Sequence, residues 1–437
     1  MRSFLSILCL TLLFWGCGEN QTSSLEDLKR PQDAMIYAQE MEEFQTPEIL
    51  QELKNTYLKE FFAPFSGMVA NPNTQEVFWI QGSLQKYPGY GENLEANTLE
   101  YTQGILQNMQ IKKYPSASQM ALVIKDTNVR AVPTMRPRFS KPNGYPFDRW
   151  QNSLIFYGTP VLITHYDVSG RYAHIQTNFV YGWVEVADLA LVSKTQAKEL
   201  LNIKTFVMPN NDTQSIKDKE GRYLTQMRVG KLFMLDDKKQ MLLFQRTSSG
   251  NLKISKTTAD LSDFHSFPQA FSQKAVAYYI NLLVGQKYGW GGMYESRDCS
   301  AFIRDIFGNF GLYLPRNSYA QAQYGNHQIG LDSLKLPQKE SMILQNAIPF
   351  ATILWLKGHI MLYIGKDQEG RAMVAHSGWS VQSSNLWEKK EHKLGGVVIT
   401  TLTPAEEYNG ILFGSPSLGD RVRIMNQLLP YLKGQIP

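Results

Sequence analysis

Cysteine is scarce in this sequence, because the 437 residues contain only three. Cys9 and Cys17 lie within and just after an apolar N-terminal run, so Cys299 is the one thiol expected in a processed chain. A lone thiol has no disulfide partner in its own chain, which excludes a disulfide scaffold and favours a reactive cysteine in an exported protein. The alternative is a buried, inert cysteine.

Strong charge of either sign is also lacking. The 44 basic and 39 acidic side chains leave a formal net charge of +5, and no basic run or arginine-rich stripe is present. This pattern disfavours nucleic acid as a partner. The mild positive charge is compatible with a polyanionic cell wall or membrane surface nearby.

The N-terminal hydrophobic run is too short to cross a bilayer. It covers residues 4–15, about a dozen positions, whereas a transmembrane helix needs about 20. Because Met1 and Arg2 give it a short positive start, the run fits a secretory signal. We therefore predict that the chain is exported.

Cys17 follows Gly16 directly after this run, an arrangement that resembles a bacterial lipobox. Phe14 and Trp15 depart from that pattern, which prefers Leu and then a small residue. We predict a lipoprotein signal peptide over residues 1–17 and a lipid anchor at Cys17, which would hold the protein on a membrane of the bacterial envelope, facing the periplasm or the outside. A plain cleaved signal and an uncleaved anchor are the alternatives.

The length predicts three or four folding units. Residues 18–117 carry apolar side chains at helical spacing and are predicted to form a largely helical N-terminal unit. Short strands separated by turns then begin, and Gly182-Trp183-Val184 resembles the closing segment of bacterial SH3-like barrels. We predict a first SH3-like barrel over 118–197 and a second, diverged one over 198–268.

Residues 269–437 contain helical segments followed by short apolar strands, which predicts an α+β unit. Within this unit, a stretch rich in glycine and aromatic residues leads to Asp298-Cys299-Ser300 at the expected start of a helix. A helix N-terminus offers free N–H groups and a positive dipole end, both of which favour thiolate over thiol. Cys299 is therefore the candidate nucleophile.

Two later histidines are placed to assist this thiol. His359 opens one predicted strand and His376 ends the next, and adjacent antiparallel strands can bring both imidazoles to one face. Thiol catalysis needs such a base and a group that orients it. A single histidine is more often a surface or core residue, but the ordered Cys-His-His set outweighs that interpretation.

Together these motifs resemble the NlpC-type cell-wall cysteine peptidases, whose fold is a trimmed papain-like one. The resemblance covers residues 269–437, and the tandem SH3-like domains extend it to a subgroup with an N-terminal stabilising region. One departure is Ile360-Met361 after the first histidine, where the family more often has Val and Gly. The matching segments are Tyr288-Gly289-Trp290-Gly291-Gly292, Asp298-Cys299-Ser300-Ala301-Phe302, Leu314-Pro315-Arg316-Asn317-Ser318, Gly358-His359 and Ala375-His376-Ser377.

The resemblance implies hydrolysis of the bond between the γ-carboxyl of D-glutamate and a diamino acid, such as diaminopimelate, in peptidoglycan stem peptides or muropeptides. Cys299 would be the nucleophile, His359 the general base and acid, and His376 the residue that orients His359. Tyr288 and Trp290 are predicted to contact the substrate. We predict neither a metal nor a cofactor.

The resemblance also implies that the substrate begins with a free L-Ala amine, bound by Asp298, Ser300 and a tyrosine from the first SH3-like domain. Tyr157 is the predicted tyrosine and Tyr181 the alternative. The enzyme would then act on trimmed muropeptides. Competing hypotheses are a non-catalytic wall-binding lipoprotein scaffold and a thiol amidase or acyltransferase that acts on another substrate.

Overall fold

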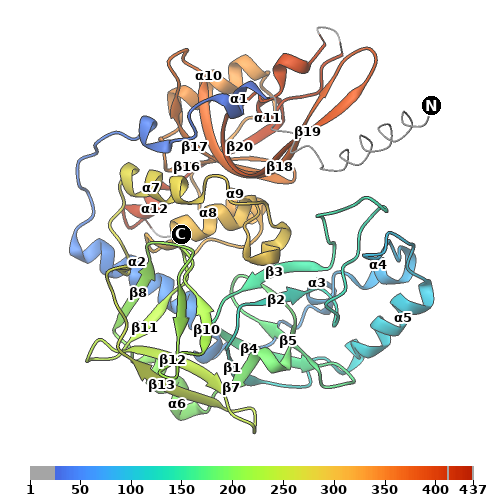
Figure 1. Cartoon of the computed structure of the whole chain (residues 1–437), viewed down its shortest axis with the longest axis vertical. Helices are drawn as coiled ribbons and strands as arrows, with labels where there is room; N and C mark the ends of the chain where they lie inside the picture. The colour runs from blue at the N-terminus through green and yellow to red at the C-terminus, as the bar shows by residue number, and fades with distance from the viewer. Residues whose placement is uncertain (1–24, 411–412, 436–437) are drawn as a thin grey trace, which may run out of the picture.

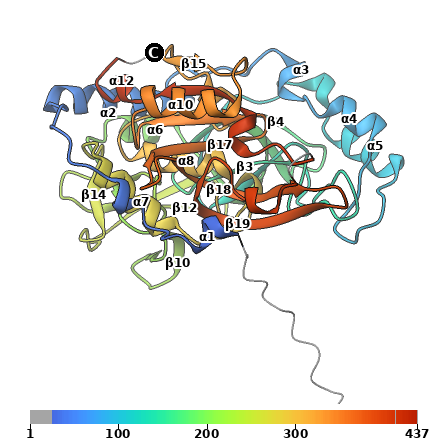
Figure 2. The same cartoon turned by 90° about the horizontal axis from the view of Figure 1, so that it is seen from above.

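The N-terminal helices are divided among the other parts of the molecule rather than gathered into one separate unit. The computed structural model describes residues 25–410 and 413–435. In two views at right angles, α2 lies at one end of the molecule and α3–α5 at the other (Figures 1 and 2). These N-terminal elements are α1 (Glu26–Lys29), η1 (Ala34–Tyr37), α2 (Pro47–Phe61), η2 (Ala63–Phe65), α3 (Thr74–Val77), α4 (Gln81–Lys86), α5 (Leu99–Asn108) and η3 (Ile111–Lys113).

The cores that these helices enter show how they are shared. Leu25 and Leu53 pack into two different cores of the C-terminal unit, whereas Phe61 belongs to the core of the second sheet. Phe78 and Ile105 pack with Trp183 of the first sheet. The predicted helical region therefore holds the other units together, because its apolar positions are buried against them.

The first sheet has seven antiparallel strands in the order β3-β2-β6-β5-β4-β1-β7. Its alternating apolar residues form one core, and the fully buried Trp183 of the predicted Gly-Trp-Val segment packs against the N-terminal helices on the other side. The elements are β1 (Gln119–Val123), β2 (Thr127–Arg130), β3 (Gln151–Ile155), β4 (Pro160–Tyr166), β5 (Tyr172–Gln176), β6 (Tyr181–Glu185), η4 (Val186–Asp188) and β7 (Leu189–Leu191).

The second sheet has five antiparallel strands in the order β13-β12-β11-β8-β14, beside a β9–β10 hairpin. Helix α6, whose first turn is closed by a capping box between Ser193 and Gln196, connects it to the first sheet. Its description as an SH3-like barrel stays a prediction. The elements are α6 (Lys194–Leu201), β8 (Thr205–Pro209), β9 (Ser215–Lys217), β10 (Tyr223–Gln226), β11 (Phe233–Leu235), β12 (Met241–Arg246), β13 (Leu252–Thr257) and β14 (Phe264–Ser266).

The C-terminal unit is a six-stranded antiparallel sheet with helices on both faces, which confirms the α+β prediction. The order is β15-β20-β16-β17-β18-β19. The elements are α7 (Gln273–Leu283), η5 (Trp290–Glu295), α8 (Cys299–Gly308), α9 (Ser318–Ala322), β15 (Gln328–Gly330), α10 (Leu336–Asn346), β16 (Thr352–Leu356), β17 (His359–Lys366), β18 (Ala372–Ser384), β19 (Lys389–Thr401), η6 (Glu406–Tyr408), α11 (Leu418–Arg421), β20 (Val422–Gln427) and α12 (Leu429–Leu432).

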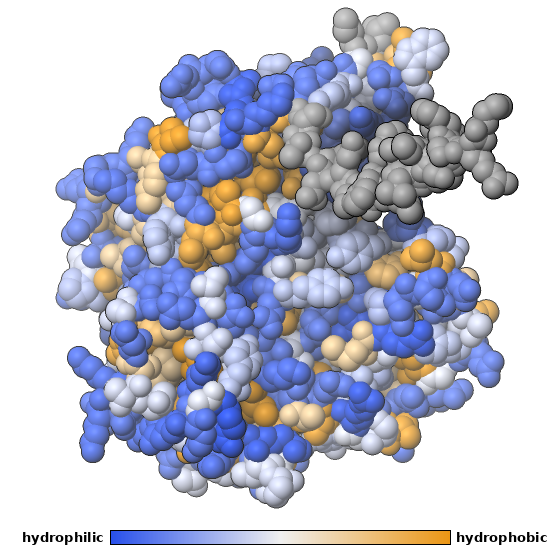
Figure 3. Space-filling view, viewed as in Figure 1, coloured by the Kyte–Doolittle hydropathy of each residue, from blue (hydrophilic) through white to orange (hydrophobic). Residues whose placement is uncertain are grey.

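The central strand β17 shows why this sheet is covered on both sides. Ile360 and Leu362 pack in the core that contains α7 and α8, whereas Met361 and Tyr363 pack in the core that contains Ile343 of α10. Because successive side chains of a strand point to opposite faces, a continuous apolar run requires a cover on each face. The face of the molecule shown in Figure 3 is mostly hydrophilic, with hydrophobic side chains gathered in its upper half.

No helix in the described ranges is long and apolar enough to cross a membrane. The predicted signal peptide over residues 1–17, with its lipid-anchor position Cys17, lies outside the described residues.

Candidate active site

The thiol is fixed at the start of a buried helix. Cys299 is the first residue of α8, and the Asp298 carboxylate caps this helix by accepting the Ala301 N–H at 2.8 Å. Phe302 and Ile306 anchor α8 in the core. The predicted helix start is confirmed, and Cys299 is 7% exposed.

The two histidines form a hydrogen-bonded pair, which the predicted adjacent strands allow. Nε2 of His359 lies 2.8 Å from Nδ1 of His376. Nε2 of His376 lies 3.1 Å from the hydroxyl of Thr400 on β19. The structure therefore extends the predicted pair by one further member.

The Thr400 hydroxyl fixes the tautomer of both rings. It donates to the Thr401 carbonyl at 2.8 Å, so it can only accept from the Nε2–H of His376. Nδ1 of His376 must then accept from the Nε2–H of His359. Nδ1 of His359 is left without a proton and is able to take one from the thiol.

The resting thiol and imidazole are both uncharged. Burial, and then the Asp298 charge, raise the pKa of the Cys299 thiol to about 12. Burial, and then the Arg421 charge, lower the pKa of His359 to about 4. This outcome differs from the sequence-based expectation of a thiolate, because desolvation penalises the charged form more than the helix end favours it.

The thiol lies beside the first residues of β17. The backbone of Ile360, the residue after His359, lies close enough to the thiol to favour its thiolate form. Within the described part of the chain, the thiol has no hydrogen bond to the His359 ring. In ligand-free enzymes such contacts are often long, and they shorten when the substrate binds.

Asp298 is held by a dense set of donors. Arg316 binds both carboxylate oxygens, at 2.7 and 3.1 Å. The Gly291 N–H and the Ser300 hydroxyl donate at 3.0 and 3.2 Å, in addition to the helix cap. Although burial opposes ionisation, Arg316 holds the pKa of Asp298 below its ordinary value. With about four lone-pair sites on a carboxylate, little capacity is left for a ligand.

The glycine-rich stretch allows the first sheet to pack directly against the site. Gly291 and Gly292 have φ angles of +59° and +83°, which favour glycine. A Cβ on Gly292 would lie 2.6 Å from Leu154 of β3. The Gln151 side chain donates to the Gly291 carbonyl at 3.0 Å, and the Trp290 indole donates to the Asp148 carbonyl at 2.7 Å.

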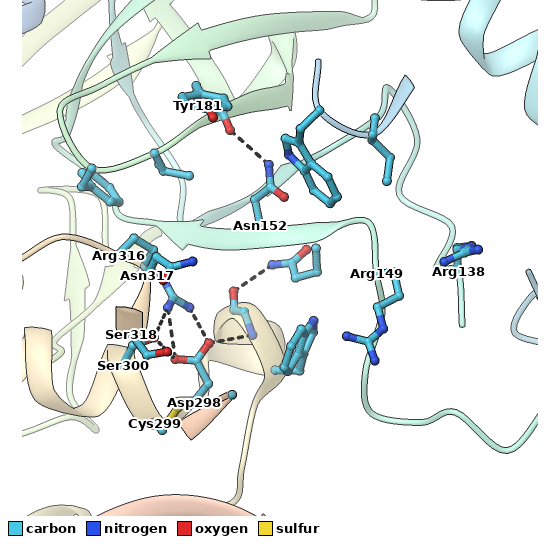
Figure 4. Close-up of a pocket in the computed structure, with 18 of the residues that line it drawn as sticks. Arg138, Arg149, Asn152, Tyr181, Asp298, Cys299, Ser300, Arg316, Asn317 and Ser318 are labelled. Carbon is cyan, nitrogen blue, oxygen red and sulfur yellow. Dashed lines mark hydrogen bonds and ion pairs between the residues drawn. The ribbon is translucent and has the colours of Figure 1, made fainter. Parts of the chain in front are cut away.

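A cavity of about 720 Å³ opens at Cys299 and is lined by three parts of the chain (Figure 4). The C-terminal unit contributes Tyr288, Trp290, Gly291, Asp298, Cys299, Ser300, Arg316, Asn317, Ser318 and Gly358. The first sheet and its loops contribute Arg138, Ser140, Arg149, Gln151, Asn152, Phe179, Val180 and Tyr181. The segment from α3 to α4 contributes Trp79, Ile80 and Ser83.

The structure places the two candidate tyrosines differently. Tyr157 is 2% exposed and lies in the core of the second sheet, where its hydroxyl accepts the Phe244 N–H. It does not line the cavity at Cys299, so this geometry speaks against the Tyr157 assignment. Tyr181, the alternative, does line that cavity, as do Tyr288 and Trp290.

Four residues at or near the site were not among the sequence-predicted site residues. Arg316 could have been found from the sequence, because it lies in the Leu-Pro-Arg segment that resembles the family. Thr400, Arg138 and Arg149 could not, since each reaches the site only through the packing of segments distant in sequence.

Comparisons with known families agree with this architecture. Three family models match the chain: the NLPC_P60 stabilising domain, N term, over residues 6–114, the SH3 domain (SH3b1 type) over 137–185, and the NlpC/P60 family over 285–395. No curated protein matches the chain.

A solved structure described as a novel NlpC/P60 endopeptidase from Photobacterium damselae subsp. piscicida shares the fold. It is 21% identical, with a TM-score of 0.80, over 91% of this chain and 97% of that one. An NlpC/P60 family protein from Bacillus cereus ATCC 10987 is 14% identical, with a TM-score of 0.48, over 71% of this chain and 100% of that one.

Proposed function

The chain is a cysteine peptidase of the NlpC/P60 family, and from this premise we propose that it cleaves the γ-D-glutamyl–diamino acid bond of peptidoglycan stem peptides. The observation that carries the proposal is the ordered set Cys299, His359, His376 and Thr400 beside a cavity that reaches the first sheet. Such a cavity can hold the peptide on one side of the thiol while the histidines act on the other.

The reaction begins with proton transfer. Nδ1 of His359 takes the thiol proton as Sγ of Cys299 attacks the γ-carbonyl carbon, which avoids a charged resting pair. The Cys299 N–H at the helix start stabilises the oxyanion, and the Tyr288 hydroxyl is a second donor. Burial, and then the Cys299 charge, raise the pKa of Tyr288, so it keeps its proton.

The protonated His359 then completes the cleavage. It gives its proton to the leaving amine of the diamino acid as the C–N bond breaks, and the thioester forms on Cys299. Water, deprotonated by His359, hydrolyses the thioester and restores the thiol. His376 and Thr400 keep the imidazole in the required tautomer throughout.

The amino-terminal part of the substrate is a separate question. The free L-Ala amine predicted from sequence needs a carboxylate acceptor, and Asp298, the one carboxylate in the cavity wall, already accepts from Arg316 and three other groups. The charge of the cavity thus favours a substrate without an ammonium group at this position, and the preference for free L-Ala stays a prediction.

The cellular setting is part of the proposal. An SH3b-type domain beside the peptidase suits a protein that works on the cell wall. We infer export and anchoring through Cys17 from the sequence of residues 1–17. Mass analysis of the mature protein tests this inference: a diacylglycerol adduct on Cys17 is expected, and its absence contradicts the anchor.

The test of the activity uses the peptide L-Ala-γ-D-Glu-diaminopimelate and the full chain. The wild-type protein should release L-Ala-D-Glu, identified by mass spectrometry, and Cys299→Ala should release none. If the wild-type protein gives no product, the proposal fails and the non-catalytic scaffold is favoured. Cleavage at a different amide would favour the amidase or acyltransferase hypothesis.

A further inference from the structure

The cavity at Cys299 has a second end that the proposed chemistry does not use. We call it the outer arm and define it by Trp79, Arg138, Arg149, Asn152 and Tyr181, all outside the C-terminal unit. Figure 4 shows both arginines on the side of the cavity away from the Asp298–Arg316 pair. The outer arm is therefore a wall built by the N-terminal helices and the first sheet.

The position of the histidines decides which half of the substrate enters this cavity. His359 must reach the leaving nitrogen, so the diamino acid lies on the histidine side of Cys299. Neither His359 nor His376 lines the cavity, whereas Asp298 and Ser300 do. The cavity consequently takes the acyl half of the substrate, which contains D-glutamate and whatever precedes it.

The wall of the cavity is cationic. It holds three guanidinium groups and one carboxylate, and Arg316 already pairs with that carboxylate. Among the residues that the structure describes, no carboxylate lies within ion-pair distance of Arg138 or Arg149. The nearby Asp148 forms a buried ion pair with Arg130 at 2.6 Å, and its charge offsets that of Arg138 only in part.

Both guanidinium groups are held in place by neutral partners. Arg138 is 8% exposed, and its guanidinium donates to the backbone carbonyls of Tyr87 and Pro88. Arg149 donates to Ser140 and stacks on Trp290, with 5.5 Å between its guanidinium carbon and the ring centre. Burial, and then the Arg149 charge, lower the pKa of Arg138. An anion between the two groups would offset their repulsion.

We propose that the outer arm binds an oxyanion in the acyl half of the substrate, through Arg138 and Arg149. Two sources carry this chemistry: the α-carboxylate of the D-glutamate itself, and a carboxylate or phosphate attached beyond L-Ala. This inference rests on the proposed function for the identity of the bond that is cleaved.

Two substrate pairs distinguish the sources. The first pair is L-Ala-γ-D-Glu-diaminopimelate and its D-isoglutamine analogue, which lacks the α-carboxylate. In the second pair, the L-Ala carries either an N-succinyl group, which has a carboxylate, or an N-acetyl group, which has none. For at least one pair, the anionic member should have a kcat/KM about tenfold higher in the wild-type protein, as expected for a charge-assisted hydrogen bond.

Variants of the two arginines test whether the outer arm causes the preference for the anionic substrate. Arg149→Gln should reduce the ratio of kcat/KM between the anionic and the neutral substrate to about one. Arg149→Lys should keep part of the preference for the anionic substrate. Arg138→Gln should act in the same direction, provided that its thermal unfolding matches that of the wild-type protein. Arg171→Gln is the matched control, because Arg171 is exposed, pairs with Glu185 and does not line the cavity.

The inference is overturned if neither pair is discriminated by the wild-type protein, or if the discrimination survives Arg149→Gln. Calorimetric binding of the dipeptide L-Ala-γ-D-Glu and of its α-amide to Cys299→Ala gives a readout without cleavage. The α-carboxylate source is supported if Cys299→Ala binds the dipeptide more tightly than its α-amide and if this difference disappears when Arg149→Gln is added. This result would hold even if the enzyme cleaves a bond other than the proposed one. Equal binding of both dipeptides excludes that source.

Discussion

At the scale of single residues, burial decides the chemistry of the thiol. Helix N-termini lower thiol pKa values, but Cys299 is enclosed by the core and lies beside the charge of Asp298. His359 is uncharged for a related reason, since burial disfavours its imidazolium form. In the proposed reaction the pair is therefore neutral at rest, and the proton moves from the thiol to His359 during the attack.

Because the resting pair is neutral, we predict that the Cys299 thiolate forms only at high pH. The difference in absorbance at 240 nm between the wild-type protein and Cys299→Ser should rise only above pH 9, because the thiol pKa is about 12. The acid limb of kcat/KM should lie near pH 4 rather than 6.5, because His359 accepts protons only above its lowered pKa. A thiolate signal at neutral pH would indicate an ion pair and contradict this assignment.

At the scale of elements, the loop η5 and the strand β3 depend on each other. Gly291 and Gly292 leave room for Gln151 and Leu154, so the approach to Cys299 is shaped by a strand of another unit. The same strand carries Ser153, whose hydroxyl lies 2.8 Å from Nε of Arg316. The helix cap, the loop and the strand thus form one continuous support for the thiol.

Adding a methyl group at position 292 should push η5 away from β3. Gly292→Ala combines an unfavourable positive φ with a clash against Leu154, and we expect a loss of roughly 2–4 kcal/mol with a fall in kcat/KM. Gly285→Ala is the control, because its φ is +80° but nothing lies within 4 Å of the added methyl. Thermal unfolding and activity measure both variants, and equal effects would contradict the packing argument.

At the scale of the whole molecule, a buried ion network joins the second sheet to helix α8, which begins at Cys299. Arg297, which is fully buried, pairs with Asp212 and with Asp305 of α8. Arg228, which follows β10, pairs with the same Asp305 at 3.0 Å. Against the effect of burial, Arg297 holds the pKa of Asp212 well below its ordinary value. The network is balanced only when both carboxylates are present.

Removing one charge should weaken the whole assembly. Asp212→Asn leaves two buried guanidinium groups to share Asp305, and loss of one partner of a buried pair costs about 3–5 kcal/mol. Glu220→Gln, in an exposed pair with Arg222, should cost far less, because solvent screens that pair. Urea unfolding compares them; a loss from Asp212→Asn no larger than the control's would mean that the network adds nothing to stability.

The sequence by itself determined the local features of the site. The capped helix start at Cys299, the strands that carry His359 and His376, and the Trp183 segment of the first sheet all follow from spacing, caps and turn residues within short windows. These signals are local, because a helix cap or a strand period involves only neighbouring residues. The sequence also contains the glycine-rich stretch, but it does not show that these glycines make room for strand β3.

Only the tertiary structure decided what surrounds the thiol. It placed Tyr181 rather than Tyr157 at the cavity, brought Arg138 and Arg149 to one wall, and set Thr400 behind His376. It also reversed the expected charge state of Cys299. Each of these outcomes depends on burial and on contacts between distant segments, which the spacing of residues along the chain does not contain.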